Sequence, residues 1–235
     1  FTAMAGFETV FNLPGENVAM RRDQIKSLGI STALILLNIA VMWGLSFTVF
    51  STFNDLLFGE FFLLGVVVYG ALLSGGVWLA RKGIRSDDVG KAAIGTVLIQ
   101  AGYGIFGAGI IGSLSAEFQA VVLGVTAAVT AALSIGAGLL VFGTDHDFSK
   151  WGRYANYLFL GVLGVSIVGS FSPMFIGIAF VMALLGFILY LVHEVYQVKI
   201  KPGRPVLNAI GLYTAFMGVF VQILQIIVEL LASRE

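Results

Sequence analysis

Few side chains in the apolar parts of this chain could do acid–base chemistry, and Glu194 is the strongest candidate among them. It lies in LYLVHEVYQVK, at the end of an apolar stretch long enough to cross a bilayer. About two helical turns, on the order of 10 Å, separate it from the polar loop that follows. A carboxylate at that depth is costly unless it is protonated, paired or hydrated, so we predict that Glu194 is the titratable group of an ion pathway. The alternative is that it only reaches the interface or pairs structurally.

Polar groups elsewhere in the apolar segments are candidate partners of this acid. The candidates that we place in the pH-sensing or ion pathway with Glu194 are His193, Tyr213, Asn208 and Arg81. Because Arg81 lies at the edge of its apolar segment, we expect its side chain to extend outward to water, with an inward turn toward an acid as the alternative. Gln222 and Gln225 are three residues apart, and we expect them to form hydrogen bonds between helices.

Glycines gather in several apolar segments. GYGIFG, from Gly102 to Gly107, matches the letters of a dinucleotide-binding loop, but that loop needs a strand before it and a helix after it. In the middle of an apolar segment, small residues are better explained as a surface where two helices approach closely. We extend this expectation to Ala108 and Gly112, and to the further residues Gly161, Gly164, Gly169 and Ser134–Gly138.

The loop TDHDFSKWGR carries an Asp-His-Asp run that resembles a metal site only superficially. Adjacent residues on a short loop cannot all face one ion, so we expect no metal or cofactor there. Asp145 or Asp147 is expected to cap the helix that follows, and Asp87 or Asp88 the helix after RKGIR. No nucleophile lies beside a base, no carboxylates are paired, and the chain has no cysteine, so we do not expect an enzyme.

The composition identifies the elements that must hold these residues. Of 235 residues, 58% are hydrophobic and only 11% are charged, which is typical of an integral membrane protein. Backbone hydrogen bonding in lipid favours helices, since the alternation of a membrane barrel is absent. We predict an all-α seven-transmembrane-helix bundle over 28–235, after an interfacial arm at 1–27. The expected spans are 28–50, 57–80, 90–113, 118–142, 154–172, 174–197 and 205–231.

The placement of basic residues predicts the topology. Every Lys and Arg except Arg234 falls before the first span or in the second, fourth or sixth connection. The positive-inside rule then puts the amino terminus in the cytoplasm and the carboxyl terminus outside. Lys plus Arg equals Asp plus Glu at 13 each, so bulk charge gives no reason to expect a nucleic-acid partner.

The carboxyl-terminal half resembles the transmembrane Bax inhibitor motif family, which has seven helices. The similarity covers 145–231 and includes GVLGVSIVGSFSP and the two helices after it. The matching positions are Asp147, Phe148 and Ser149, then Leu189, Tyr190, Glu194, Gln197 and Lys199, and finally Ala209, Leu212, Tyr213, Phe216, Phe220 and Leu224.

The resemblance implies a mechanism that this sequence cannot use unchanged. The family is described as closing a calcium-leaking pore with a proton-sensitive pair of buried aspartates. The first aspartate corresponds to Glu194, the second to Ala215, and the family's asparagine further on to Gly218. A shared-proton pair needs two carboxylates, so Ala215 marks a lost latch position. Of the family's pair of acids, this sequence keeps one, Glu194, together with its possible partners.

The function expected from these residues is a membrane cation leak, with calcium as the candidate ion, in the plasma membrane of a prokaryote. Ionised Glu194 would attract a cation and protonated Glu194 would not, so the leak should rise with pH. The alternative is a non-conducting scaffold, or a subunit bound to another membrane protein through an amino-terminal arm with Phe7, Val10, Phe11 and Leu13. A secondary transporter is disfavoured because we find no inverted repeat and no broken helix pair.

Overall fold

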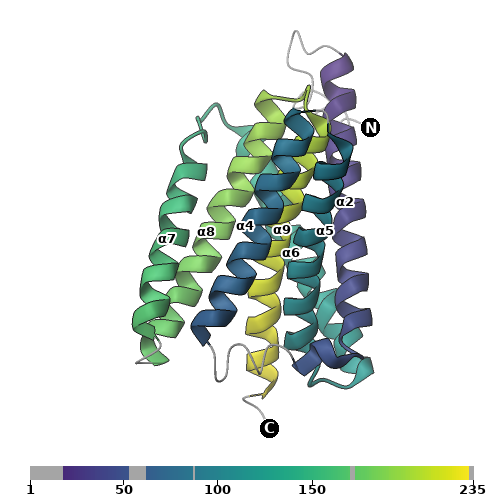
Figure 1. Cartoon of the computed structure of the whole chain (residues 1–235). Helices are drawn as coiled ribbons and strands as arrows, with labels where there is room; N and C mark the ends of the chain where they lie inside the picture. The colour runs from purple at the N-terminus through teal and green to yellow at the C-terminus, as the bar shows by residue number, and fades with distance from the viewer. Residues whose placement is uncertain (1–17, 53–61, 87, 170–172, 233–235) are drawn as a thin grey trace, which may run out of the picture.

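The computed structural model describes residues 18–52, 62–86, 88–169 and 173–232, which form helices joined by turns and loops and contain no strand. They form seven long α-helices and one short 3-10 helix (Figure 1). In chain order these are α2 (Val18–Leu45), η1 (Val49–Thr52), α4 (Phe62–Arg85), α5 (Val89–Ile111), α6 (Ala116–Gly143), α7 (Trp151–Gly169), α8 (Pro173–Ile200) and α9 (Pro205–Ala232). Proline is the first residue of both α8 and α9, a position where its missing N–H is no loss.

Five of these helices are long and apolar enough to cross a membrane: α2, α5, α6, α8 and α9. The other two, α4 and α7, carry basic residues within the helix. α4 ends in ARKGIR with three basic residues, and α7 has 19 residues with Arg153 in its first turn. The seven predicted segments therefore all fold as helices within the described residues, while the crossing of the membrane by α4 and α7 stays a prediction.

The first helix begins earlier than the sequence suggested. We expected a separate arm to extend to residue 27, but α2 starts at Val18 and its apolar span begins at Arg21. Residues 18–27 thus continue the first long helix, because nothing in VAMRRDQIKS breaks a helix. The rest of the arm lies outside the described residues.

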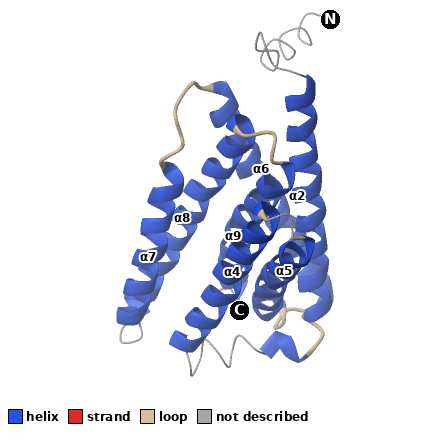
Figure 2. Cartoon of the chain, turned by 45° about the horizontal axis from the view of Figure 1, so that its top comes forward, coloured by secondary structure: helices blue, strands red, loops and turns tan. Residues whose placement is uncertain are grey.

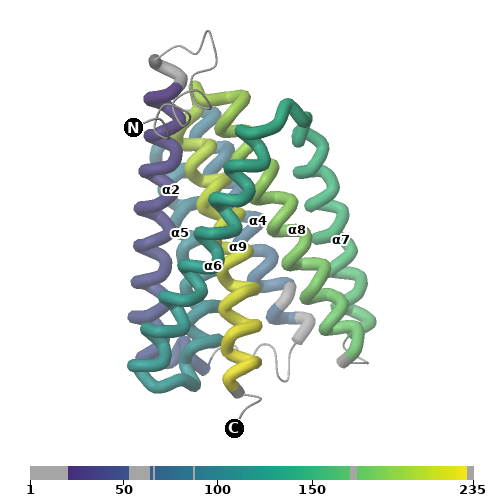
Figure 3. The backbone as a smooth tube through the Cα atoms, turned by 180° about the vertical axis from the view of Figure 1, so that it is seen from behind, coloured from purple at the N-terminus to yellow at the C-terminus, as the bar shows by residue number. Residues whose placement is uncertain are grey.

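Helix α9 lies at the centre of the bundle. It contacts α2, α4, α5, α6 and α8, and every residue from 208 to 221 is buried (Figures 1 and 3). Its large side chains, among them Tyr213 and Phe220, are fully enclosed by the surrounding helices. The axis of the bundle is therefore filled by a helix, and any path across the molecule would have to run along the side of α9.

Glycine allows the closest helix approaches. A Cβ atom on Gly95 of α5 would overlap the backbone of Ala80 on α4, and one on Gly107 would overlap Met42 on α2. The GYGIFG segment is thus a helix contact surface, as predicted. The same prediction is wrong for Gly136 and Gly138 of α6 and for Gly164 of α7, where a Cβ would meet nothing within 4 Å. These three glycines face away from the neighbouring helices.

Helices α7 and α8 form a hairpin at one side of the bundle. α7 packs along α8, with Gly161 against Met182 and Gly169 against Ile176, and it makes few contacts with α4. Lys199 near the end of α8 holds the hairpin to α6, since its ammonium donates to the carbonyls of Val141 at 2.8 Å and Thr144 at 3.1 Å.

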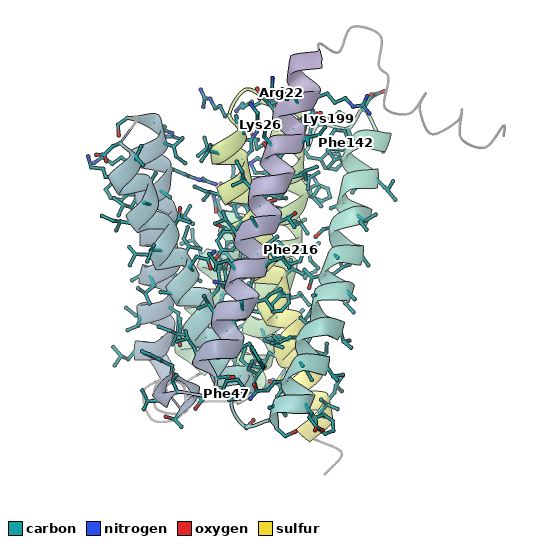
Figure 4. The ribbon with its side chains drawn as sticks, turned by 90° about the vertical axis from the view of Figure 1, so that its right-hand side faces the viewer. Arg22, Lys26, Phe47, Phe142, Lys199 and Phe216 are labelled. Carbon is teal, nitrogen blue, oxygen red and sulfur yellow. The ribbon has the colours of Figure 1, made fainter. Side chains whose placement is uncertain are left out.

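Basic residues gather at one end of the bundle, which we call the basic end. It is formed by the first residues of α2, α5, α7 and α9 and the last residues of α4, α6 and α8. Figure 4 shows Arg22, Lys26 and Lys199 at this end, Phe216 near the middle and Phe47 at the opposite end. The charge pattern matches the predicted alternation of connections, whereas the side of the membrane that this end faces stays a prediction.

Two acids at the basic end were expected to cap helices. Asp88 is the N-cap of α5 and accepts from the backbone N–H of Lys91 at 3.0 Å. Side-chain and backbone hydrogen bonds from Lys91 hold the pKa of Asp88 below its usual range. Asp147 instead accepts from the backbone N–H of Ser149 at 2.8 Å, in the turn before α7, and this bond lowers its pKa. Asp87 lies outside the described residues.

Candidate functional site

The carboxylate of Glu194 is buried where α8 faces α9. The residue is only 5% exposed, although it lies close to the basic end. It can pack there because position 211 of α9 is a glycine, on which any Cβ would collide with the carboxylate. The residue that faces Glu194 on α9 is therefore Gly211, and the depth of Glu194 in the bilayer stays a prediction.

A cation from a third helix pairs with this acid. Arg81, one turn before the end of α4, places Nη2 3.0 Å from Oε1 of Glu194. The same nitrogen donates to the hydroxyl of Tyr190 at 2.6 Å. Tyr190 and Glu194 are four residues apart, so they share one face of α8. Arg81, Tyr190 and Glu194 form what we call the ion-pair site.

The direction of the Arg81 side chain differs from our first expectation. We favoured an outward extension to water, but the guanidinium turns inward and its side chain is 35% exposed. The physical reason is the buried carboxylate, whose ionised form needs a charge-assisted partner at low dielectric. The site thus joins α4, α8 and α9 at the basic end.

His193 is adjacent in sequence but makes different contacts. Its Nδ1 lies 3.2 Å from the carbonyl oxygen of Phe148, and its Nε2 lies 3.3 Å from Nε2 of Gln197. A proton on Nδ1 satisfies both contacts, because Nδ1 then donates and Nε2 accepts. The ring also covers Gly152 at the start of α7. His193 therefore holds α7 against α8, and the structure gives it no bond to Glu194.

Asn208 and Tyr213 also lack a bond to the acid. The amide of Asn208 donates to the carbonyl of Lys201 at 2.8 Å and so closes the carboxyl end of α8. Tyr213 is fully buried, and its ring meets Tyr103 edge to face at 6.4 Å. Its hydroxyl has no hydrogen-bond partner among the described residues. Of the four predicted partners, Arg81 is the one that forms a hydrogen bond and an ion pair with Glu194 within the described residues.

Ala215 is fully buried in an apolar cluster with residues of α6 and α8. The register of α8 and α9 shows where Ala215 lies relative to Glu194. Gly211 faces Glu194, and Gly218 faces Phe187 two turns further along. Position 215, between these two contacts, therefore lies about level with Tyr190, one helical turn from Glu194. Ala215 and Glu194 are neighbours in depth but do not face each other.

A cavity of about 240 Å³ opens at the basic end above the ion-pair site. Its residues are polar with one exception, Leu207, and positive charges outnumber negative ones. They are Glu194, His193, Gln197, Asn208, Arg81, Arg85, Lys201 and Arg204. With Glu194 neutralised by Arg81, the other three cations give this cavity a positive potential.

The sequence contained signals for the two site residues that we did not predict. Tyr190 lies one helical turn before Glu194, on the same face of α8. Glu194 and Gly211 lie equally far from the centre of the loop between α8 and α9, so antiparallel pairing brings them together. Counting from that loop could have identified Gly211.

Comparison with known proteins gives one match. A family model described as "Inhibitor of apoptosis-promoting Bax1" matches residues 104–234, which is more than half of the chain. The chain belongs to the Bax inhibitor family. The match includes the end of α5 and all of α6, so this relationship extends beyond the segment whose resemblance we noted. No curated protein and no solved structure matches the chain. Family membership and the apolar helices together make it a multi-pass membrane protein.

Proposed function

We propose that this Bax inhibitor family protein is a cation leak whose closing element is the ion pair between Arg81 and Glu194. The observation that carries the proposal is a buried carboxylate held by an arginine from another helix beneath a polar cavity. Ionisable groups at this depth in a membrane helix are expensive, and they commonly mark an ion path. Arg81 lies where it can leave Glu194 without unfolding, because its side chain is partly exposed.

In this mechanism Arg81 closes the path, which is the role that the second acid of the pair would have had. Ala215 can hold neither a proton nor an ion, so a pair of carboxylates cannot share a proton here. Instead, the guanidinium neutralises Glu194, and a cation reaches the carboxylate only when Arg81 moves away. Protonation of Glu194 removes its attraction for a cation, so the leak falls as the pH falls and rises as the pH rises.

The lining of the path predicts slow and poorly selective conduction. Calcium prefers six to eight oxygen ligands, and near Glu194 the cavity adds the side-chain amides of Gln197 and Asn208. Arg85, Lys201 and Arg204 at its mouth repel a cation that arrives from the basic end. Calcium is the proposed ion because of the family resemblance, and we expect monovalent cations to pass as well.

We further propose that all seven long helices cross the plasma membrane of a prokaryote, with the basic end in the cytoplasm. The charge asymmetry between the two ends supports this orientation. α4 is included because its three basic residues lie in its last two turns, which leaves the preceding part apolar. No catalytic reaction is proposed.

A non-conducting scaffold is the second candidate. The position of α9 favours it, because a buried helix fills the bundle axis where a pore could otherwise run. Under this proposal the protein would purify in a fixed ratio with another membrane protein. Purification in mild detergent, followed by mass spectrometry of the complex, distinguishes this candidate from a protein that conducts by itself.

Ion flux into proteoliposomes tests the leak. Calcium and potassium flux would be measured from about pH 5 to about pH 8, the interval over which most folded proteins keep their maximal stability. We expect a flux that rises with pH and that Glu194→Gln makes small and independent of pH. Glu229→Gln is the matched control, because Glu229 is an exposed acid near the opposite end of the bundle. Flux equal to that of empty liposomes throughout would reject the leak.

A further inference from the structure

A long groove separates α4 from the α7–α8 hairpin. Its volume is about 1530 Å³, and Figure 2 shows the two parts of the bundle between which it lies. Most of its wall is apolar. The apolar side chains come from α4, α7 and α8 and include Val67, Ala71, Val77, Leu160, Leu163 and Phe187. Since α7 makes few contacts with α4, the groove is open along its side to the surroundings of the helices.

The groove is long enough to hold a lipid tail. Its lining on α4 runs from Val67 to Arg81 and on to Ser86 at the basic end. At the rise of an α-helix, the distance from Arg81 to Val67 is about 21 Å, somewhat more than half of a hydrocarbon core of about 30 Å. An acyl chain of one leaflet therefore fits along the groove in full.

Positive charge gathers at one end of this groove. Lys82 and Arg85 of α4 and Arg153 of α7 line it there, and no ion pair engages them within the described residues. Glu194 is the single acid among the described lining residues, and Arg81 already neutralises it. The basic end of the groove therefore carries about three uncompensated positive charges, which complement an anion.

Trp78 lies between the apolar wall of the groove and its positively charged end. The ring is 61% exposed, and the ammonium of Lys82 lies over it at 4.8 Å. Tryptophan and lysine in this arrangement are typical of the boundary between hydrocarbon and lipid headgroups. With α4 and α7 across the membrane, as proposed above, the cations of the groove would lie at headgroup height and its apolar wall at acyl-chain height.

We infer that the groove binds an anionic phospholipid, with its phosphate against Lys82, Arg85 and Arg153 and one acyl chain along the wall between α4 and α7. A soluble anion would leave the apolar wall unfilled, and an apolar helix from a partner would leave the three cations unpaired. An anionic lipid satisfies both parts. The inference rests on the proposed crossing of the membrane by α4 and α7, which the cysteine labelling described below tests separately, and it does not depend on ion conduction.

The fluorescence of Trp78 tests the inference directly. Trp43→Phe and Trp151→Phe leave Trp78 as the single tryptophan, because the chain contains three. The protein would be reconstituted in phosphatidylcholine vesicles with a small fraction of brominated-tail phosphatidylglycerol or, in parallel, brominated-tail phosphatidylcholine. We expect several-fold stronger quenching by the anionic lipid at equal fraction. Equal quenching by the two lipids would overturn the inference.

Matched variants distinguish binding of the anionic lipid in the groove from its attraction to surface charge in general. Lys82→Gln with Arg85→Gln and Arg153→Gln should reduce the preference for the anionic lipid at least about tenfold, given the attraction of each basic residue for anionic lipid. The control, Arg21→Gln with Arg22→Gln and Lys26→Gln, removes the same charge from α2 and should keep the preference. An equal loss in both would mean that surface charge alone attracts the lipid, which would contradict the proposed site.

A separate variant tests whether an acyl chain lies along the apolar wall of the groove. Gly70 lines the groove, and a Cβ there would meet nothing within 4 Å, so Gly70→Phe can fill the space without displacing the backbone. We expect it to abolish the additional quenching by the anionic lipid. Gly136→Phe on α6 is the control, since a Cβ at Gly136 also enters open space. Unchanged quenching in Gly70→Phe would show that no acyl chain lies in the groove.

Discussion

Glu194 is held by contacts from two other helices and from its own. Arg81 donates to it from α4, Tyr190 shares that arginine from one turn earlier on α8, and Gly211 leaves the room for it on α9. The distance of Glu194 from the loop after α8 followed from counting residues. The inward turn of Arg81 did not, because it depends on the rotation of α4 relative to α8, which the spacing within one helix does not determine.

The first prediction concerns the strength of this pair. Arg81→Gln should destabilise the protein by about 1–3 kcal/mol, less than for a fully buried pair because Arg81 is 35% exposed and water screens it. Glu194→Gln should cost less, since the remaining arginine can still reach water. The double variant should be more stable than the sum of the single changes predicts. Thermal unfolding in detergent measures this, and strictly additive effects would contradict the pairing.

At the scale of helices, sequence patterns predicted the elements well and their faces less well. Long apolar runs predicted the seven helices, because lipid leaves the backbone few alternatives. The helix face that looks inward was harder to predict, as Gly136 and Gly138 show. Gln225 donates to Glu229 on the same helix at 2.9 Å, and Gln222 Oε1 has no partner among the described residues, so this part of the chain does not show the predicted bonds between helices. One sequence does not separate inward faces from lipid-facing ones.

The second prediction tests the close approach of α8 and α9. Gly211→Ala would place a methyl group on the carboxylate of Glu194 and should destabilise the protein by about 1–3 kcal/mol, the usual cost of overpacking. Gly136→Ala on α6 is the control, where open space and the better helix propensity of alanine predict a neutral or slightly stabilising effect. Equal unfolding temperatures for the two variants would show that Glu194 does not need Gly211.

The whole molecule combines a charge pattern that could be read from the sequence with a packing order that could not. Basic residues at alternate connections predicted that they meet at one end, and they do. The central position of α9 was not predictable, because α8 and α9 are equally apolar and a membrane accepts an apolar helix either in its core or against lipid.

The third prediction concerns orientation. Since the chain has no cysteine, single cysteines report sidedness without background. Ser86→Cys at the basic end should react with an impermeant maleimide from the cytoplasmic side, and Ser115→Cys at the other end from the outer side. Both positions are exposed. Labelling of both from one side would refute the proposed topology.

The flux of Arg81→Gln tests whether Arg81 closes a path whose attraction for cations comes from Glu194. Calcium flux into proteoliposomes at neutral pH would be compared for the native protein, Arg81→Gln, Glu194→Gln and the double variant. We predict that Arg81→Gln raises the flux above native, and that adding Glu194→Gln returns it to the low level of Glu194→Gln alone. A flux that Arg81→Gln leaves unchanged or lowers would contradict it.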